Sequence, residues 1–232
     1  MDVLIVAAII AILSIILKFL FGANLKKLKK ITENEKLDKV IEKYPDNTEV
    51  CEWFLKKLKN EKVKIQEDEQ SDASLYLVVG NTIKIGKIGQ SFTRIQTIAH
   101  ECIHSIQSKK LLIANFILSN LYFLYFIVMV FLRFGKNEII VENQSIILFS
   151  FMALGLCFYA IRTYLENDAM IKARYLAKQY LEEQKISNEK EIDEIIESYD
   201  KMNDIGIKCV NYNIFLIVTV IIVLFSIICA AR

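Results

Sequence analysis

The chain has 232 residues, with 29 Lys and Arg against 27 Asp and Glu, so its formal net charge is only +2. A charge this small argues against a nucleic-acid-binding protein, which would present a strongly basic face. The chain is 54% hydrophobic and yet 24% charged, two values that are compatible only if the apolar residues are concentrated in blocks.

Four apolar blocks are present along the chain. They are Val3 to Leu17, continued after one lysine to Phe21, then Leu111 to Leu132, Asn143 to Ile161 and Cys209 to Ala231. About 20 apolar residues match the roughly 30 Å hydrocarbon core of a bilayer. The sequence therefore predicts a mostly α-helical, multi-pass membrane protein with four transmembrane helices.

The charges between the blocks predict how the chain crosses the membrane. The start Met1-Asp2-Val3 lacks the basic region of a secretory signal, so the first block is expected to be an uncleaved anchor. Four lysines between positions 26 and 30 place the following segment in the cytoplasm and near anionic lipid. We expect an anchor at 1–22, a cytoplasmic part at 23–110, a transmembrane hairpin at 111–161, a second cytoplasmic part at 162–208 and a C-terminal transmembrane helix at 209–232.

The cytoplasmic parts predict a small α+β domain built from two separate pieces. Residues 24–43 have an amphipathic helical pattern that stops at Pro45, and Asp46 or Asn47 can cap a second helix. The segment LYLVVGNTIKIG predicts two strands that meet in a turn at Gly80-Asn81. Further helices are expected at 92–110, 163–183 and 189–203.

The segment IAHECIHSIQ, residues 98–107, contains both histidines of the chain. His100 and His104 are four residues apart, so on a helix their imidazoles lie one turn apart on a common face, where one Zn²⁺ can bridge them. Glu101 lies beside this row, and its carboxylate can reach a water at the metal rather than the metal itself. This is the H-E-x-x-H arrangement of zinc metalloproteases.

A catalytic zinc also needs a third protein ligand and one open position. Cys102 points away from the histidine face, so a carboxylate must supply the third ligand. The best candidate is Glu166, because two membrane crossings return it to the side of His104. The small side chain of Ala169, three residues later, allows the helix of Glu166 to lie close to the motif helix.

The order of these motifs resembles a known family. His-Glu-Cys-Ile-His with Gln107, then a membrane hairpin, then Glu-Asn-Asp-Ala from Glu166 to Ala169, is similar to the bacterial membrane-bound neutral zinc metallopeptidases, of the HExxH plus ExxA type. More distantly it resembles the heat-shock-induced and prenyl-protein membrane metalloproteases. Those relatives carry aspartate after the alanine, where this chain has Met170. Asp168 lies on a different helical face and cannot take the place of that aspartate. The sequence therefore does not assign the hydrogen-bond partners of the zinc ligands.

The motif and the resemblance imply an integral-membrane zinc-dependent endopeptidase that hydrolyses peptide bonds in polypeptide substrates. Zinc held by His100, His104 and Glu166 would activate a water, with Glu101 as the general base. The zincin-like domain, and with it the active site, is expected on the cytoplasmic side of the cell membrane. The sequence does not indicate an oligomeric state.

The residues leave several alternatives open at the site. Asp168 could be the third ligand in place of Glu166, or Glu166 could form an ion pair with Arg162 or Arg174. The strands at 75–88 are either an edge on which an extended peptide aligns or a covered scaffold. Three side chains are candidates for stabilising an oxyanion: Tyr164, Arg174 and Tyr175.

Two other functions compete with this interpretation. An intramembrane protease also uses H-E-x-x-H, but polar residues flank the motif from Arg94 to Lys110, which favours an interfacial or cytoplasmic helix. A non-catalytic membrane scaffold or regulatory protein could hold a structural or degenerate zinc site. Glu101 argues against that scaffold, because structural zinc sites usually complete their ligands with cysteine or histidine and have no use for an adjacent carboxylate.

Overall fold

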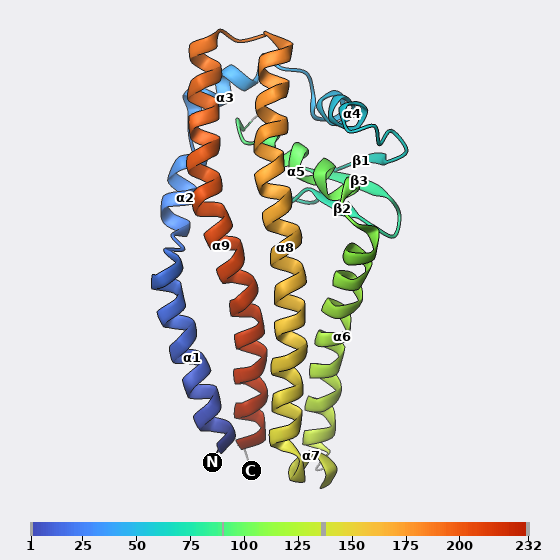
Figure 1. Ribbon diagram of the computed structural model, residues 1–232, viewed down its shortest axis with the longest axis vertical. Helices are drawn as coiled ribbons and strands as arrows, with labels where there is room; N and C mark the ends of the chain where they lie inside the picture. The colour runs from blue at the N-terminus through green and yellow to red at the C-terminus, as the bar shows by residue number, and fades with distance from the viewer. Residues whose placement is uncertain (1, 90, 136–137, 231–232) are drawn as a thin grey trace. The chain divides into compact units, whose positions relative to one another are not determined.

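The computed structural model describes residues 2–89, 91–135 and 138–230 (Figure 1). The elements in chain order are α1 (Asp2–Phe21), α2 (Leu25–Thr32), α3 (Glu35–Ile41), α4 (Asn47–Lys57), β1 (Lys64–Asp68), β2 (Leu75–Leu77), β3 (Thr82–Gly86), α5 (Arg94–Ile106), α6 (Lys109–Phe134), α7 (Glu138–Glu142), α8 (Gln144–Gln184) and α9 (Glu189–Ala230). The structure is mostly helical, with one small sheet, as the composition predicts.

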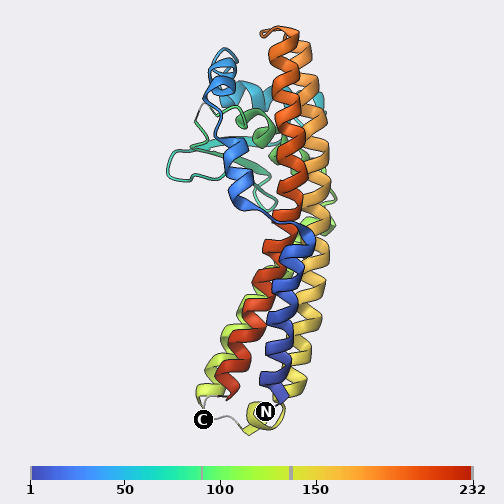
Figure 2. The ribbon, with the colours of Figure 1, turned by 90° about the vertical axis from the view of Figure 1, so that its left-hand side faces the viewer.

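The chain divides into two compact units. The helical unit comprises Met1–Ala23, Ala114–Tyr164 and Lys208–Arg232, and the mixed unit comprises Asn24–Ile113 and Leu165–Ile207. The helix expected at 163–183 is part of α8, since no glycine or proline interrupts the chain where the third apolar block ends. The helix expected at 189–203 is part of α9, which continues through Gly206 into the fourth apolar block. Within the mixed unit, the later half of α8 and the first half of α9 run side by side in both views (Figures 1 and 2).

Within the described residues, four helices are long and apolar enough to cross a membrane: α1, α6, α8 and α9. In the helical unit Phe151 is fully buried, with its ring 4.5 Å from that of Tyr125 and 4.9 Å from that of Phe225. Gly155 permits a close helix approach, because a Cβ there would lie 2.5 Å from a methyl group of Val218. Large apolar side chains also point outward, among them Phe19 at 78% exposure. Such a surface is compatible with a lipid environment.

The mixed unit contains a three-stranded sheet in the order β1-β3-β2. The predicted hairpin is confirmed, because β2 pairs antiparallel with β3, and Asn81 in the turn has a positive φ of 48°. The strand β1 pairs parallel with β3, with Ile65 opposite Ile83, and was not predicted. Its sequence, KIQED, is mostly polar and exposed, so it lacks the apolar alternation that signals a strand.

The helices before the sheet depend on their caps. The single helix expected over 24–43 is two helices, because Asn34 accepts a hydrogen bond from the Leu37 N–H and begins α3. The predicted cap of α4 is confirmed, with Asp46 Oδ1 accepting from the Glu49 N–H at 2.8 Å. The helix expected over 92–110 ends earlier, at Ile106, and α6 begins at Lys109.

The core of the mixed unit surrounds α5. Apolar residues of α5, including Ile95, Ile98 and Ala99, are fully buried in one cluster with residues of α3, α4, β3, α8 and α9. Along one face of α8 the side chains in this cluster are small, because Ala169, Ala173 and Ala177 are each at 0% exposure. Residues four apart on a helix share a face, so α8 contributes a flat stripe of methyl groups to the core.

Three polar side chains of the motif helix are buried within the protein. Arg94 is 1% exposed, Gln96 5% and Ser105 4%. Nη2 of Arg94 donates hydrogen bonds to the carbonyls of Ile41, Tyr44 and Pro45 at and just after the end of α3, which provide acceptors for this end of the buried guanidinium. These residues anchor α5 inside the protein.

Candidate metal centre

The helix α5 carries both histidines on one face. The ring centroids of His100 and His104 are 4.6 Å apart, and their Nε2 atoms are 3.0 Å apart. The spacing of four residues produces this proximity, because it corresponds to about one helical turn. The two nitrogen atoms therefore point into the same small volume.

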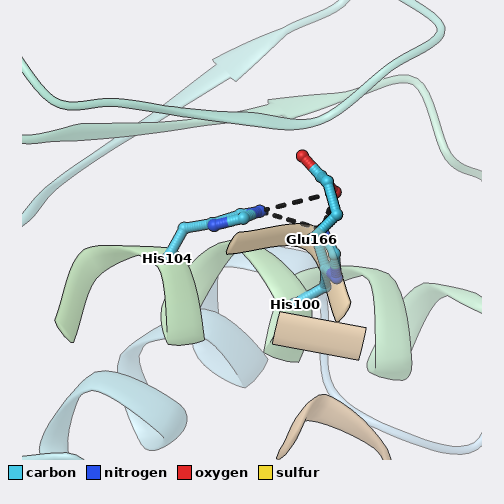
Figure 3. A group of neighbouring side chains, drawn as sticks. All are labelled: His100, His104 and Glu166. Atoms are coloured by element: carbon cyan, nitrogen blue, oxygen red, sulfur yellow. Dashed lines mark hydrogen bonds and ion pairs between the residues drawn. The ribbon is translucent and has the colours of Figure 1, made fainter. Parts of the chain in front are cut away.

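The helix α8 brings Glu166 to the same place (Figure 3). Its Oε2 lies 3.3 Å from Nε2 of His100 and 3.8 Å from Nε2 of His104. These separations are close to the roughly 3.3 Å that divides two ligand atoms of a tetrahedral zinc site with bonds of about 2.0 Å. Among the described residues these three form a group that could hold a metal ion.

Burial is uneven within this group. The side chains of His104 and Glu166 are each 10% exposed, whereas that of His100 is 20% exposed. Burial lowers the pKa of His104, but the hydrogen bond with Glu166 and the charges of Glu101 and Glu166 outweigh it, so the pKa lies above its usual value. The group thus concentrates negative charge around two imidazoles, which suits a bound cation.

Glu101 follows His100 on α5 and is buried, at 7% exposure. Burial raises the pKa of Glu101, although His100, His104 and the backbone N–H of Tyr76 in β2 act in the opposite direction. The described metal-binding group consists of the other three residues, so Glu101 lies beside the ligand row, as the spacing predicts. A carboxyl group with a raised pKa is better suited to exchanging protons near neutral pH.

Gln107 connects this group to α8. Its Oε1 lies 2.8 Å from Nδ1 of His104, and its Nε2 donates to the carbonyl of Leu165 at 2.8 Å and to Oδ2 of Asp168 at 2.9 Å. Oδ1 of Asp168 pairs with Lys172 at 2.7 Å. Asp168, the alternative third ligand, therefore contacts Gln107 and Lys172 instead of joining the group formed by Glu166. Asp168 is linked to His104 indirectly, through the side chain of Gln107. The sequence did not reveal this role of Gln107.

The polar residues on the other side of the group were also missed. Gln96 Nε2 donates to Oδ1 of Asn203 at 2.6 Å, and Asn203 Nδ2 donates to the carbonyl of Met170 at 3.2 Å. Gln96 is one turn before His100 and Met170 is one turn after Glu166, so this network joins α5, α8 and α9 beside both ligands. Gln96 was visible at its helical spacing, but Asn203 is remote in sequence and gave no signal.

Two candidates for stabilising an oxyanion are engaged elsewhere. Arg174 pairs with Oδ1 of Asp200 at 3.1 Å and donates to the hydroxyl of Tyr175 at 2.8 Å. Arg174 is also eight residues beyond Glu166 on α8, which is about 12 Å along a helix axis. The alternative in which Glu166 pairs with Arg174 therefore does not fit the structure.

Comparisons with protein-family models, with curated proteins and with solved structures found no match to this chain.

Proposed function

We propose that this chain is an integral-membrane zinc-dependent endopeptidase. The observation that carries the proposal is the convergence of His100, His104 and Glu166, whose three donor atoms lie within 4.8 Å of one another although the glutamate is remote in sequence. Two imidazoles and one carboxylate, with a fourth position open, are the ligands of a common class of catalytic zinc site. The resemblance to bacterial membrane-bound neutral zinc metallopeptidases points to the same class of enzyme.

The residues divide into ligands and a base. Zinc in this position would supply a Lewis acid that lowers the pKa of a water towards about 7 and polarises the scissile carbonyl. Glu101 takes the proton of the attacking water and passes it to the leaving amine. Its place beside His100, and its raised pKa, suit it to both transfers.

The strand β2 is the element best placed to hold a polypeptide substrate. It lies at one end of the strand order β1-β3-β2, and the backbone N–H of Tyr76 reaches Glu101. Leu75 and Leu77, on either side of Tyr76, are 36% and 39% exposed. An extended peptide that pairs with this edge would lie beside the base, which favours a substrate platform over a covered scaffold.

The helices and the charges support a location in the cell membrane. The four long apolar helices are compatible with a bilayer, and the lysines of α2 follow α1 directly. The positive-inside rule then supports a multi-pass protein of the cell membrane with the mixed unit in the cytoplasm.

The division of roles is tested by two isosteric substitutions in the detergent-purified full chain. Glu101→Gln keeps all three ligands, so zinc content should stay near one per chain, while hydrolysis of casein should fall by about 10²- to 10⁴-fold. Glu166→Gln should lose both zinc and activity, because only two ligands remain.

The outcomes separate the enzyme from its alternatives. If the wild type binds zinc but cleaves neither casein nor itself, the protein is a scaffold with a structural zinc. If Glu101→Gln loses zinc as readily as Glu166→Gln, the assignment of base and ligand is wrong. If the wild type retains no zinc, the metal centre itself is refuted.

A further inference from the structure

Gln107 makes three hydrogen bonds whose directions are fixed by its partners. The carbonyl of Leu165 and the carboxylate of Asp168 can only accept, so the amide nitrogen of Gln107 must face them. Its oxygen then faces Nδ1 of His104 at 2.8 Å. An amide oxygen only accepts, so Nδ1 must carry the ring proton and Nε2 of His104 is left with its lone pair.

The position of Gln107 in the chain supports this arrangement. It is the C-cap of α5, with extended backbone angles (φ −66°, ψ 166°), and its backbone N–H donates to the carbonyl of His104. Its amide nitrogen contacts Leu165, which immediately precedes Glu166 on α8. One side chain therefore touches the ring of one ligand and the backbone next to another, although the two ligands lie on different helices.

We propose that Gln107 is a positioning residue of the metal centre, which holds His104 in the tautomer with a free Nε2 and fixes α5 against α8 at Glu166. Asp168, itself paired with Lys172, sets the direction of the Gln107 amide. The proposal rests on the proposed function in one respect, that the group of His100, His104 and Glu166 binds zinc. Removing a hydrogen-bond partner of a metal-bound histidine typically weakens metal binding by about 10- to 100-fold.

The first test measures zinc affinity in the detergent-solubilised full chain, by competition with a chelator of known affinity. Gln107→Met keeps the length of the side chain but removes its hydrogen bonds, and should weaken zinc binding by about 10- to 100-fold. Gln179→Met is the matched control, because the hydrogen bond that Gln179 donates to Glu183 lies at the surface of α8. It should bind zinc as the wild type does.

The second test exchanges donor and acceptor between the two partners. Gln107→Glu still accepts from His104 but places a carboxylate against the carboxylate of Asp168, so zinc binding should weaken by at least about 10-fold. In the double variant with Asp168→Asn, the new amide can donate to the new carboxylate. Zinc binding should therefore recover part of that loss, because the repulsion from residue 168 is removed while the carbonyl of Leu165 still faces a carboxylate oxygen. A residue that only supports folding would not be rescued in this way.

Each outcome decides a separate point. Wild-type zinc affinity in Gln107→Met, or no recovery in the double variant, overturns the positioning role while leaving the metal centre intact. Absence of zinc in the wild type overturns the metal centre, and this inference with it. Proteolysis is not needed as a readout, so an inactive protein that binds zinc still tests Gln107.

Discussion

Among the side chains that the structure describes, Arg94 is the largest that is fully buried, and its replacement should be strongly destabilising. Its Nη2 donates to the carbonyls of Ile41, Tyr44 and Pro45 at 2.8 to 3.1 Å, and its Nη1 donates to Oδ1 of Asn47 at 3.1 Å. These bonds tie the turn between α3 and α4 to the first residue of α5, the helix that carries the histidines. Arg94→Met keeps an unbranched side chain but removes every donor.

The expected loss of stability in Arg94→Met depends on the backbone and side-chain acceptors that would be left in the interior without a donor. A hydrogen bond to a charged group contributes about 1.5 to 3 kcal/mol, and a buried acceptor without a donor costs about 1 to 3 kcal/mol. Part of this loss is offset, because the variant no longer buries a charge. Breaking a buried charged network typically costs about 3 to 5 kcal/mol, which for a chain of this size lowers Tm by roughly 6 to 20 °C.

The assay is thermal unfolding followed by circular dichroism in detergent at a fixed scan rate. Arg174→Met is the control, because Arg174 makes a surface pair with Asp200, with side chains 27% and 49% exposed. Such pairs contribute about 0.2 to 1 kcal/mol, so its Tm should stay within a few degrees of the wild type. If Arg94→Met unfolds no earlier than Arg174→Met, the role assigned to the buried guanidinium is refuted.

Two further predictions concern topology and helix packing. Reporters fused after Lys110 and after Lys190 should both register as cytoplasmic, given the lysine distribution, and opposite results would exclude the topology and Glu166 as ligand together. Ala169→Leu adds bulk at a fully buried position of α8, and should destabilise the chain by about 1 to 3 kcal/mol and weaken zinc binding by displacing Glu166. The same zinc assay with Ile171→Ala, at a half-exposed position of α8, should show no change.

The features that sequence alone determined are those governed by neighbours along the chain. Helical periodicity placed His100 and His104 on one face with Glu101 beside them, because residues four apart are about one turn apart in any α-helix. The apolar blocks gave the four long helices, since their length and composition are properties of the blocks themselves. Local chemistry likewise predicted a helix cap at Asp46 or Asn47, of which Asp46 is the cap, and the turn at Gly80-Asn81.

The features that only the tertiary structure decided involve partners remote in the chain. The strand β1 forms because β3 offers it a partner, and Arg94 is buried because a distant turn supplies its acceptors. Glu166 was the predicted third ligand, but its distance from the histidines depends on how α8 packs on α5. The end of α5 at Ile106 directs Gln107 towards α8, where it links His104 to Asp168. No local pattern specifies such contacts, because each depends on two segments that meet only when the core closes between them.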